Sequence, residues 1–301
     1  MTALDYLTYF AVGYTALTLA FYMLSLVVPK AGFVARVLAS YISLVVAALF
    51  GVFSSILLRL VGSYQIAQWA TARCFKFVMA LTTGVTFEVQ DPSNALETRP
   101  AVFIANHQSE LDVLMLGWSF PKYCSMTAKS SLKRTPFLGW FMILSGAIFI
   151  NRSNTKDARQ AMSGAAEEIR SKRQSVYMFP EGTRSYSKEP ELLPFKKGAF
   201  HLAVQAQVPI VPIVVANYSH VLWIKGLIFR SGSIPIRILD PISTKGLTTA
   251  DVDELTRSTR ELMLKELISV TQEARGKTPA ISAQHSNGVA KVTGSDLKAA
   301  A

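Results

Sequence analysis

A histidine and an aspartate five positions apart are the first pair in this sequence that could move a proton. They lie in the stretch Ala-Asn-His-Gln-Ser-Glu-Leu-Asp at 105–112, directly after an apolar run that predicts a strand at 101–105. An imidazole beside a carboxylate is a common general base, because the acid fixes the tautomer and stabilises the imidazolium that forms. We therefore take His107 and Asp112 as candidate catalytic residues, with an ordinary local hydrogen bond as the alternative.

The spacing of this pair limits where its two members can lie. Five residues on a regular α-helix leave two side chains about 140° apart around the axis, so the two would not share a face. We therefore expect His107 in the loop after the strand and Asp112 in the first turns of a helix at 109–118. Ser109 has a side chain of the kind that caps helix N-termini, and we expect it to cap this helix.

A second polar stretch, Phe-Pro-Glu-Gly-Thr-Arg-Ser at 179–185, follows the strand expected at 176–179. A glycine lets backbone amides approach an anion, and a guanidinium binds two phosphate oxygens at once. The turn is therefore typical of a phosphate site, although the chain has no G-x-x-x-x-G-K-[ST] segment of a P-loop. Lys129 and Arg152 add cations after two further expected strands.

Other types of catalytic or metal site have little support in the sequence. Cys74 and Cys124 are the two cysteines and form no C-x-x-C, which indicates reduced thiols rather than disulfides, zinc or redox chemistry. H-E-x-x-H and paired metal ligands are also lacking, so we expect no metal. There is no G-x-S-x-G elbow for a serine nucleophile, and Cys124 as nucleophile is a minor alternative.

The elements that position these residues form an α/β pattern from residue 85 onward. Short β-rich runs alternate with helical stretches, which predicts a domain at 85–250 with a central mixed sheet and flanking helices. The expected strands are 85–89, 101–105, 124–127, 147–150, 176–179, 210–215 and 234–239, and the expected helices are 109–118, 157–170 and 198–207. A C-terminal helix at 251–275 and a disordered tail at 276–301 follow.

Two uncharged runs precede this domain and predict an N-terminal hydrophobic two-helix membrane hairpin at 1–63. Residues 6–29 and 37–58 carry no Asp, Glu, Lys, Arg or His. As helices of about 36 and 33 Å, both are long enough for a hydrocarbon core of about 30 Å. The short connection at 30–36 carries two cations, which suits a hairpin. A monotopic, re-entrant hairpin is the alternative to two spans.

Residues 64–84 predict an amphipathic helix between the hairpin and the domain. Apolar side chains recur at steps of three and four and so form one stripe, with Trp69 at its border and Lys76 on the other face. The pattern suits a helix at the membrane interface, and a helix facing the core explains the stripe about as well. The stripe consists of Ile66, Ala70, Cys74, Phe77 and Leu81.

The balance of charge limits the partners of this chain. It carries 31 Lys and Arg against 20 Asp and Glu, a net charge of +11. Such an excess suits nucleic acid, anionic lipid headgroups or a phosphorylated small substrate. The two apolar runs, together with the lack of basic clusters interleaved with aromatic residues, argue against nucleic acid.

Four stretches in this order resemble the membrane-bound glycerolipid acyltransferases, and specifically the 1-acylglycerol-3-phosphate acyltransferases of the fungal endoplasmic-reticulum type. They are 106–112, 146–152, 179–185 and the proline-punctuated strand at 208–213. The resemblance covers residues 85–240, and the two-span segment that precedes them is similar to that of the fungal enzymes.

This resemblance implies transfer of a fatty acyl chain from acyl-CoA to the 2-hydroxyl of lysophosphatidic acid, giving phosphatidic acid. It implies His107 as general base and Asp112 as its orienting partner, without an acyl-enzyme and without a cofactor other than the co-substrate acyl-CoA. It places the protein in the endoplasmic reticulum membrane or on lipid droplets. The residues implied at the acceptor phosphate site are Glu181, Gly182, Thr183, Arg184, Arg152 and Lys129.

Three other functions remain open from the sequence. A glycerol-3-phosphate acyltransferase and a lysophospholipid remodelling acyltransferase are the nearest enzymes. The stretch 179–185 favours a phosphomonoester acceptor, and the hairpin favours an acceptor that already carries one acyl chain. A membrane-anchored lipid-binding scaffold is the alternative that is not an enzyme, and it would need no His and Asp at a strand end.

Overall fold

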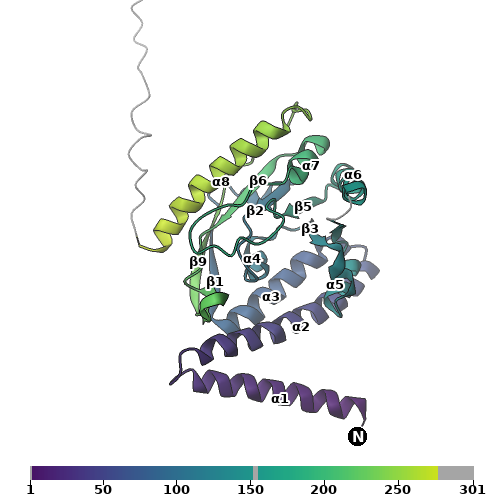
Figure 1. Cartoon of the computed structure of the whole chain (residues 1–301). Coiled ribbons are helices and arrows are strands. Elements are labelled where there is room, and N and C mark those ends of the chain that lie inside the picture. The colour runs from purple at the N-terminus through teal and green to yellow at the C-terminus, as the bar shows by residue number, and fades with distance from the viewer. Residues whose placement is uncertain (1, 152–154, 277–301) are drawn as a thin grey trace, which may run out of the picture.

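The computed structural model of this chain describes residues 2–151 and 155–276 (Figure 1). Arg152 and nearly all of the predicted tail at 276–301 therefore lie outside the described residues. The helices are α1 (Ala3–Leu24), α2 (Ala31–Leu60), α3 (Ala67–Thr83), α4 (Asp112–Ser119), α5 (Leu138–Leu144), α6 (Thr155–Lys172), α7 (Gly198–Ala206) and α8 (Val252–Ala274). The strands are β1 (Val85–Gln90), β2 (Val102–Ala105), β3 (Cys124–Lys129), β4 (Ile148–Ile150), β5 (Ser175–Met178), β6 (Ile210–Val215), β7 (Leu222–Trp223), β8 (Ile228–Phe229) and β9 (Gly232–Ile238).

The N-terminal hairpin consists of α1 and α2, both of which are long and apolar enough to cross a membrane. Helix α2 begins at Ala31, so residues 31–36, which we expected in the connection, form its first turns. Small residues recur at every fourth position along α2 and are buried, so that α3 can approach its backbone closely. They are Ala31, Ala35, Ala39, Ser43, Ala47, Gly51 and Ser55.

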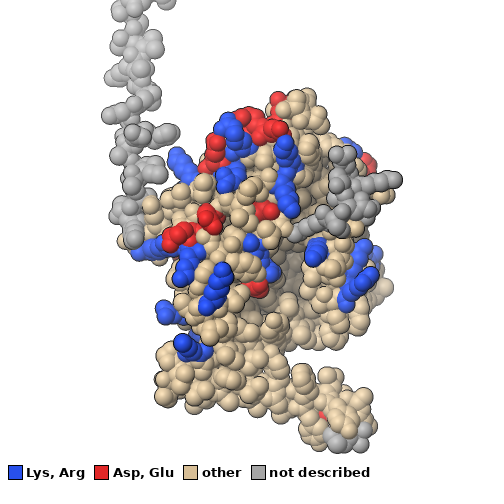
Figure 2. All heavy atoms as spheres, viewed as in Figure 1, with Lys and Arg blue, Asp and Glu red and all other residues tan. Residues whose placement is uncertain are grey.

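Both ends of α2 also contact the α/β part of the molecule. Near its start, Arg36 donates hydrogen bonds to the carbonyl oxygens of Thr83 and Phe229. Near its end, Arg59 donates to the carbonyl oxygen of Leu144. The helix therefore lies along the α/β part over its whole length, whereas α1 is almost entirely exposed. Figure 2 shows few charged side chains on the α1 and α2 part and many over the rest of this face.

Helix α3 presents a different face to the core from the one that the apolar stripe suggests. Its buried residues include Thr71, Phe75 and Met79, whereas Phe77 and Leu81 of the stripe are 69% and 87% exposed. The core-facing interpretation of the stripe is therefore wrong. The small-residue face of α2 packs on α3, and this contact decides which side of α3 is buried.

Within the part of the chain that the structure describes, the large sheet has seven strands in the order β1-β9-β6-β2-β5-β3-β4. The five strands from β6 to β4 run parallel to one another, and the parallel pair of β1 and β9 joins them through an antiparallel contact between β9 and β6. The sheet is thus mixed, as predicted. Helix α7 packs on both α6 and α8, all three helices contact the sheet, and α3 and α4 form a second packed group.

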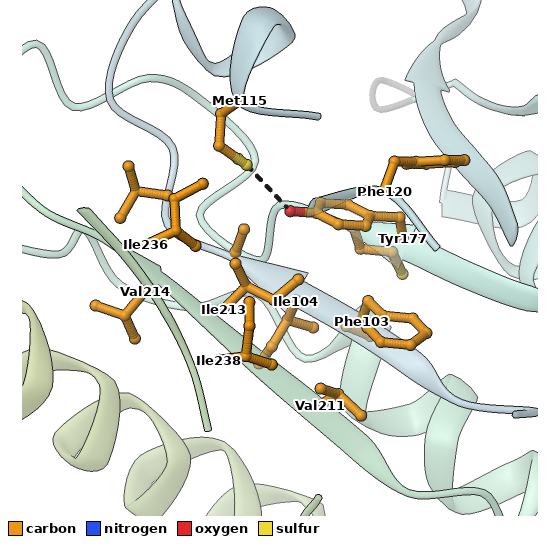
Figure 3. Close-up of a cluster of buried hydrophobic side chains, with 14 of the residues drawn as sticks. Phe103, Ile104, Met115, Phe120, Tyr177, Val211, Ile213, Val214, Ile236 and Ile238 are labelled. Carbon is orange, nitrogen blue, oxygen red and sulfur yellow. Dashed lines mark hydrogen bonds between the residues drawn. The ribbon is translucent and has the colours of Figure 1, made fainter. Parts of the chain in front are cut away.

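The central strands β2, β5 and β6 are buried along their whole length. This explains why the sequences of these strands are continuous apolar runs and do not alternate between apolar and polar residues. Phe103 of β2 and Tyr177 of β5 stack in this core, and the Tyr177 hydroxyl contacts Met115 of α4 (Figure 3). The two short strands β7 and β8 were not predicted from the sequence, and they pair with each other in a separate sheet.

Candidate active site

The polar stretches follow neighbouring parallel strands and meet at one edge of the sheet. His107 comes two residues after β2, and the stretch 179–185 begins directly after β5, the neighbour of β2. The two loops are joined by backbone hydrogen bonds: Ser185 N–H donates to the His107 carbonyl at 2.9 Å, and Tyr186 N–H donates to that of Gln108 at 3.0 Å. This edge is therefore the candidate active site.

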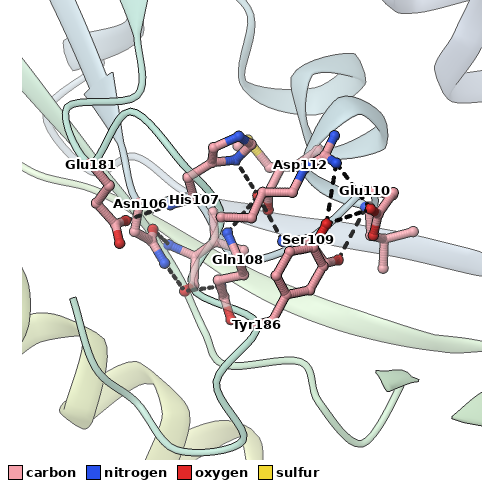
Figure 4. Close-up of polar contacts among 12 residues, drawn as sticks. Asn106, His107, Gln108, Ser109, Glu110, Asp112, Glu181 and Tyr186 are labelled. Carbon is pink, nitrogen blue, oxygen red and sulfur yellow. Dashed lines mark hydrogen bonds and ion pairs between the residues drawn. The ribbon is translucent and has the colours of Figure 1, made fainter. Parts of the chain in front are cut away.

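The imidazole of His107 and the carboxylate of Asp112 are in direct contact (Figure 4). Nδ1 of His107 lies 2.7 Å from Oδ2 of Asp112, which is fully buried. Because Nδ1 faces the carboxylate, Nε2 on the other side of the ring is directed away from it. The ring also stacks on Phe179, with centroids 4.1 Å apart. An imidazole held in this way can accept a proton at Nε2.

The helix that carries Asp112 begins later than we expected. Helix α4 starts at Asp112, and Ser109 does not cap it. The Asp112 carboxylate instead accepts hydrogen bonds from the backbone N–H groups of Gln108 and Ser109 at 2.6 and 3.1 Å. These bonds hold the segment 108–111 in a turn outside the helix, which lets His107 and Asp112 meet despite their unfavourable helical spacing.

Tyr218 is a further partner of this pair that the sequence did not reveal. Its hydroxyl donates a hydrogen bond to Oδ1 of Asp112 at 2.6 Å, and it also lies 2.9 Å from Oγ of Ser109. The residue follows β6, which is the other parallel neighbour of β2. A polar side chain just after such a strand is the signal that could have pointed to it, but no local spacing links it to Asp112.

Asn106 anchors the start of the loop that carries His107. Its side-chain amide donates to the carbonyl of Val215 at 3.0 Å, and its carbonyl oxygen accepts from the Val215 N–H at 2.9 Å. Gln108 adds hydrogen bonds to the carbonyl oxygens of Val215 and Ala216. The loop is therefore tied to the end of β6 on both sides of His107.

Glu181 connects the two loops from a buried position. Its Oε1 accepts the His107 backbone N–H at 2.7 Å, and its Oε2 accepts that of Leu193 at 2.9 Å (Figure 4). Burial raises the pKa of this carboxyl from 4.5 to about 7, against the lowering effect of the two N–H donors. Both carboxyl oxygens thus accept hydrogen bonds from backbone amides. Glu181 therefore supports the backbone at His107 and is not directed toward a phosphate on the exposed side of the loops.

Arg184 lies on the exposed side of the same loops and is paired with Glu110. Its Nη1 lies 2.9 Å from Oε1 of Glu110, and Tyr186 donates its hydroxyl to the same oxygen at 2.6 Å. The Arg184 side chain is one-third exposed, and its Nε is buried without a hydrogen-bond partner among the described residues. A phosphate that binds Nη1 of Arg184 would therefore replace the Glu110 carboxylate.

The backbone conformation and close packing at Gly182 favour a glycine at this position. Its φ is +71°, and a Cβ at this position would lie 2.9 Å from the end of the Lys196 side chain. Lys196 thus packs over the turn expected to bind phosphate, although no motif pointed to it. Thr183 beside it is exposed, and Lys129 is exposed at the end of β3, two strands away from β2.

The cysteines and the possible metal ligands lie apart from this arrangement. Cys124 is the first residue of β3 and so lies at the amino ends of the parallel strands, whereas His107 lies beyond their carboxyl ends. Burial raises the pKa of the Cys124 thiol. A protonated thiol is a poor nucleophile. Within residues 2–151 and 155–276, no three His, Cys, Asp or Glu side chains are grouped so that they could hold a metal ion.

Comparisons with known proteins place this site in context. Residues 86–216 match the acyltransferase family. The chain is 46% identical to the 1-acyl-sn-glycerol-3-phosphate acyltransferase of Saccharomyces cerevisiae over 233 residues, or 77% of this chain and 75% of that protein. It is 39% identical to the human 1-acyl-sn-glycerol-3-phosphate acyltransferase beta over 228 residues, or 75% of this chain and 80% of that protein. The crystal structure of the 1-acyl-sn-glycerophosphate (LPA) acyltransferase PlsC from Thermotoga maritima superposes with a TM-score of 0.60 at 22% identity, over 89% of this chain and 99% of that one, which shows a shared fold.

Proposed function

Because this chain belongs to the acyltransferase family, as do the 1-acyl-sn-glycerol-3-phosphate acyltransferases of yeast and human to which it is similar, we propose that it acylates the 2-hydroxyl of 1-acylglycerol-3-phosphate. The acyl donor is acyl-CoA, and the products are phosphatidic acid and CoA. The observation that carries this proposal is the contact of 2.7 Å between His107 Nδ1 and Asp112 Oδ2 at the edge of the sheet.

The reaction follows from the orientation of the His107 ring. Nε2 accepts the proton of the acceptor hydroxyl as its oxygen attacks the thioester carbonyl, and a tetrahedral intermediate forms. The intermediate then collapses, the carbon–sulfur bond breaks, and the departing sulfur receives the proton from the imidazolium. Asp112 holds the ring and stabilises its charge between the two steps. No side chain of this protein becomes acylated.

The acceptor phosphate binds on the exposed side of the two loops. Arg184 offers two guanidinium N–H groups in a plane that matches two phosphate oxygens. Gly182 and Thr183 lie in the turn before it, and Lys129 stands at the end of a neighbouring strand. Arg152 belongs to this site by its place in the sequence.

The α1–α2 hairpin holds the enzyme at the membrane of the endoplasmic reticulum. A helix of 30 residues is about 45 Å long, and α2 contacts the α/β part at both ends. If α2 crossed the bilayer, the helix and strand ends that contact it would have to lie in the hydrocarbon. These contacts support the monotopic arrangement, with the exposed apolar side chains of α1 and α2 in the lipid.

A test of the proposed activity uses the purified full-length protein in phosphatidylcholine vesicles with acyl-CoA. The acceptors are lysophosphatidic acid, lysophosphatidylinositol, lysophosphatidylcholine and glycerol-3-phosphate. We expect lysophosphatidic acid to give the highest kcat/KM, and His107→Ala to reduce turnover at least about a hundredfold. His201→Ala, which changes an exposed histidine on α7, is the matched control. A preference for another acceptor would contradict the proposed substrate, and a His107→Ala enzyme with more than a tenth of normal turnover would contradict the proposed base.

A further inference from the structure

We propose that Tyr218 is a positioning residue of the His107–Asp112 pair: its hydroxyl holds the Asp112 carboxylate in the orientation that presents the other oxygen to the imidazole. The inference rests on the proposed function, because it assumes that this pair acts as the general base. It goes beyond that function by assigning a task to a residue more than a hundred positions away in the sequence.

The hydrogen bonds to Asp112 are divided between its two oxygens. Oδ2 receives His107 Nδ1 and the backbone N–H groups of Gln108 and Ser109. Oδ1 receives the Tyr218 hydroxyl at 2.6 Å, and this is its one hydrogen bond to any residue that the structure describes. Three groups thus hold Oδ2, and Tyr218 is the described group that fixes the position of Oδ1.

The direction of the hydrogen bonds at Tyr218 follows from its single proton. Since the hydroxyl donates to Asp112, Ser109 Oγ at 2.9 Å must donate to the phenol oxygen. Tyr218 is 1% exposed, so water does not reach this contact. Burial, and after it the charge of Asp112, raises the pKa of the phenol, which keeps it a donor throughout the range of an enzyme assay.

Removal of this donor has two consequences for the base. The carboxylate would lose part of its orientation, and its charge would be less compensated in a buried environment. A less compensated carboxylate favours the protonated imidazolium, which cannot accept a proton from the substrate. His107 and Tyr218 contact Asp112 directly, while Tyr177 and Glu181 from the β5 side and Arg184 interact with its charge.

The primary test is the pH dependence of Tyr218→Phe in the vesicle assay. We expect kcat to fall about tenfold, the KM for both substrates to stay within about twofold, and the acidic limb of kcat to move up by about half a pH unit. Tyr177→Phe is the matched control, because it removes a second fully buried hydroxyl, which contacts Ser119 and Met115 and interacts with the Asp112 charge without a hydrogen bond to it. It should lower the thermal unfolding temperature and move the acidic limb much less than Tyr218→Phe does.

A second variant keeps the inference testable if Tyr218→Phe does not fold. Incorporation of 3-fluorotyrosine at position 218 retains the shape and makes the phenol a stronger donor, so the acidic limb should move to lower pH. An unchanged acidic limb in the fluorinated enzyme, or in a folded Tyr218→Phe enzyme, overturns the inference. If His107→Ala is inactive while the Tyr218 variants behave like the unsubstituted enzyme, only this inference fails. If His107→Ala remains active, the proposed base itself fails.

Discussion

Three carboxylates near His107 lie in different environments, and each environment suits a different task. Asp112 is fully buried and contacts the imidazole, whereas Glu181 is buried against two backbone amides. Glu110 is about half exposed and pairs with Arg184. The same functional group thus contacts the imidazole of the proposed base, supports the loop, or pairs with the arginine of the proposed phosphate site.

At Glu110, we predict that the Glu110→Gln substitution lowers the KM for lysophosphatidic acid by about two- to fivefold, with little change in kcat. The phosphate then no longer has to replace a carboxylate, and an exposed ion pair of this kind contributes about 1 kcal/mol or less. Arg184→Lys should raise the same KM, because it loses the planar fork that binds two oxygens.

Initial rates at varied concentrations of each substrate measure this effect. Glu254→Gln is the control, because it breaks an exposed pair with Arg257 on α8, away from the site. A change confined to the KM for acyl-CoA would show that Arg184 binds phosphates of the donor instead.

At Glu181, we predict a contribution to stability that depends on pH. The folded protein raises the pKa of this carboxyl to about 7 from 4.5, so the group stabilises the fold below about pH 4.5 and loses that contribution as the pH rises to about 7. The difference in unfolding free energy is at most about 3 kcal/mol.

Thermal unfolding of Glu181→Gln and of the unsubstituted enzyme in detergent micelles checks this sign. The unfolding temperature of the unsubstituted enzyme should fall, relative to that of the variant, between pH 5 and pH 7.5. Glu191→Gln, which removes an exposed carboxylate of the following segment, should show no such trend. If the unfolding temperature of the unsubstituted enzyme instead rose relative to that of Glu181→Gln, the two N–H donors would lower the pKa of Glu181 more than burial raises it.

At the scale of elements, the site depends on how helices begin and on which faces they bury. Helix α4 starts at Asp112 because that side chain accepts the N–H groups of the preceding turn. Helix α2 packs closely on α3 because its buried face consists of small residues. In turn, α3 packs on α4. The hairpin thereby supports the helix that carries Asp112.

We predict that Gly51→Ala destabilises the protein by about 1–3 kcal/mol, because its Cβ would lie 2.6 Å from the ring of Phe141. Gly13→Ala on α1 is the matched control, since no atom lies within 4 Å of the added Cβ. Glycine is the weaker helix former, so Gly13→Ala should leave stability unchanged or raise it by up to about 1 kcal/mol. Equal effects of both substitutions on the thermal unfolding temperature would show that the packing of α2 is unimportant.

At the scale of the whole molecule, apolar surface and charge are separated. The outer faces of α1 and α2 are apolar and exposed, and α3 adds Phe77 and Leu81. Lys and Arg side chains lie over the α/β part in the same view (Figure 2). One side of the molecule therefore suits lipid, while the other suits water and a charged substrate.

We predict that replacing Phe77 and Leu81 together by serine lowers the partition coefficient of the enzyme into phosphatidylcholine vesicles at least about tenfold. The kcat on detergent-dispersed substrates should be unchanged, because both side chains are exposed on α3 and belong to neither of the loops that carry the polar stretches. Leu262→Ser on α8 is the control, since this side chain is 39% exposed on a helix remote from the hairpin. Equal vesicle binding by the unsubstituted enzyme, the double variant and Leu262→Ser would show that α3 does not contact the membrane.

The strands of the large sheet could be predicted from the sequence to within about two residues, together with the polar stretches that follow them. Apolar runs and their period are local properties, and parallel strands bring their carboxyl ends to one edge. The spacing also predicted that His107 lies in a loop, and the structure places it there. The buried side of α3 could not be predicted in this way, because it depends on the partner helix α2 and not on the stripe of α3. The contact of Tyr218 with Asp112 and that of Glu181 with the backbone of His107 join residues 106 and 74 positions apart. Such contacts arise from the order of strands in the sheet, which no local pattern encodes.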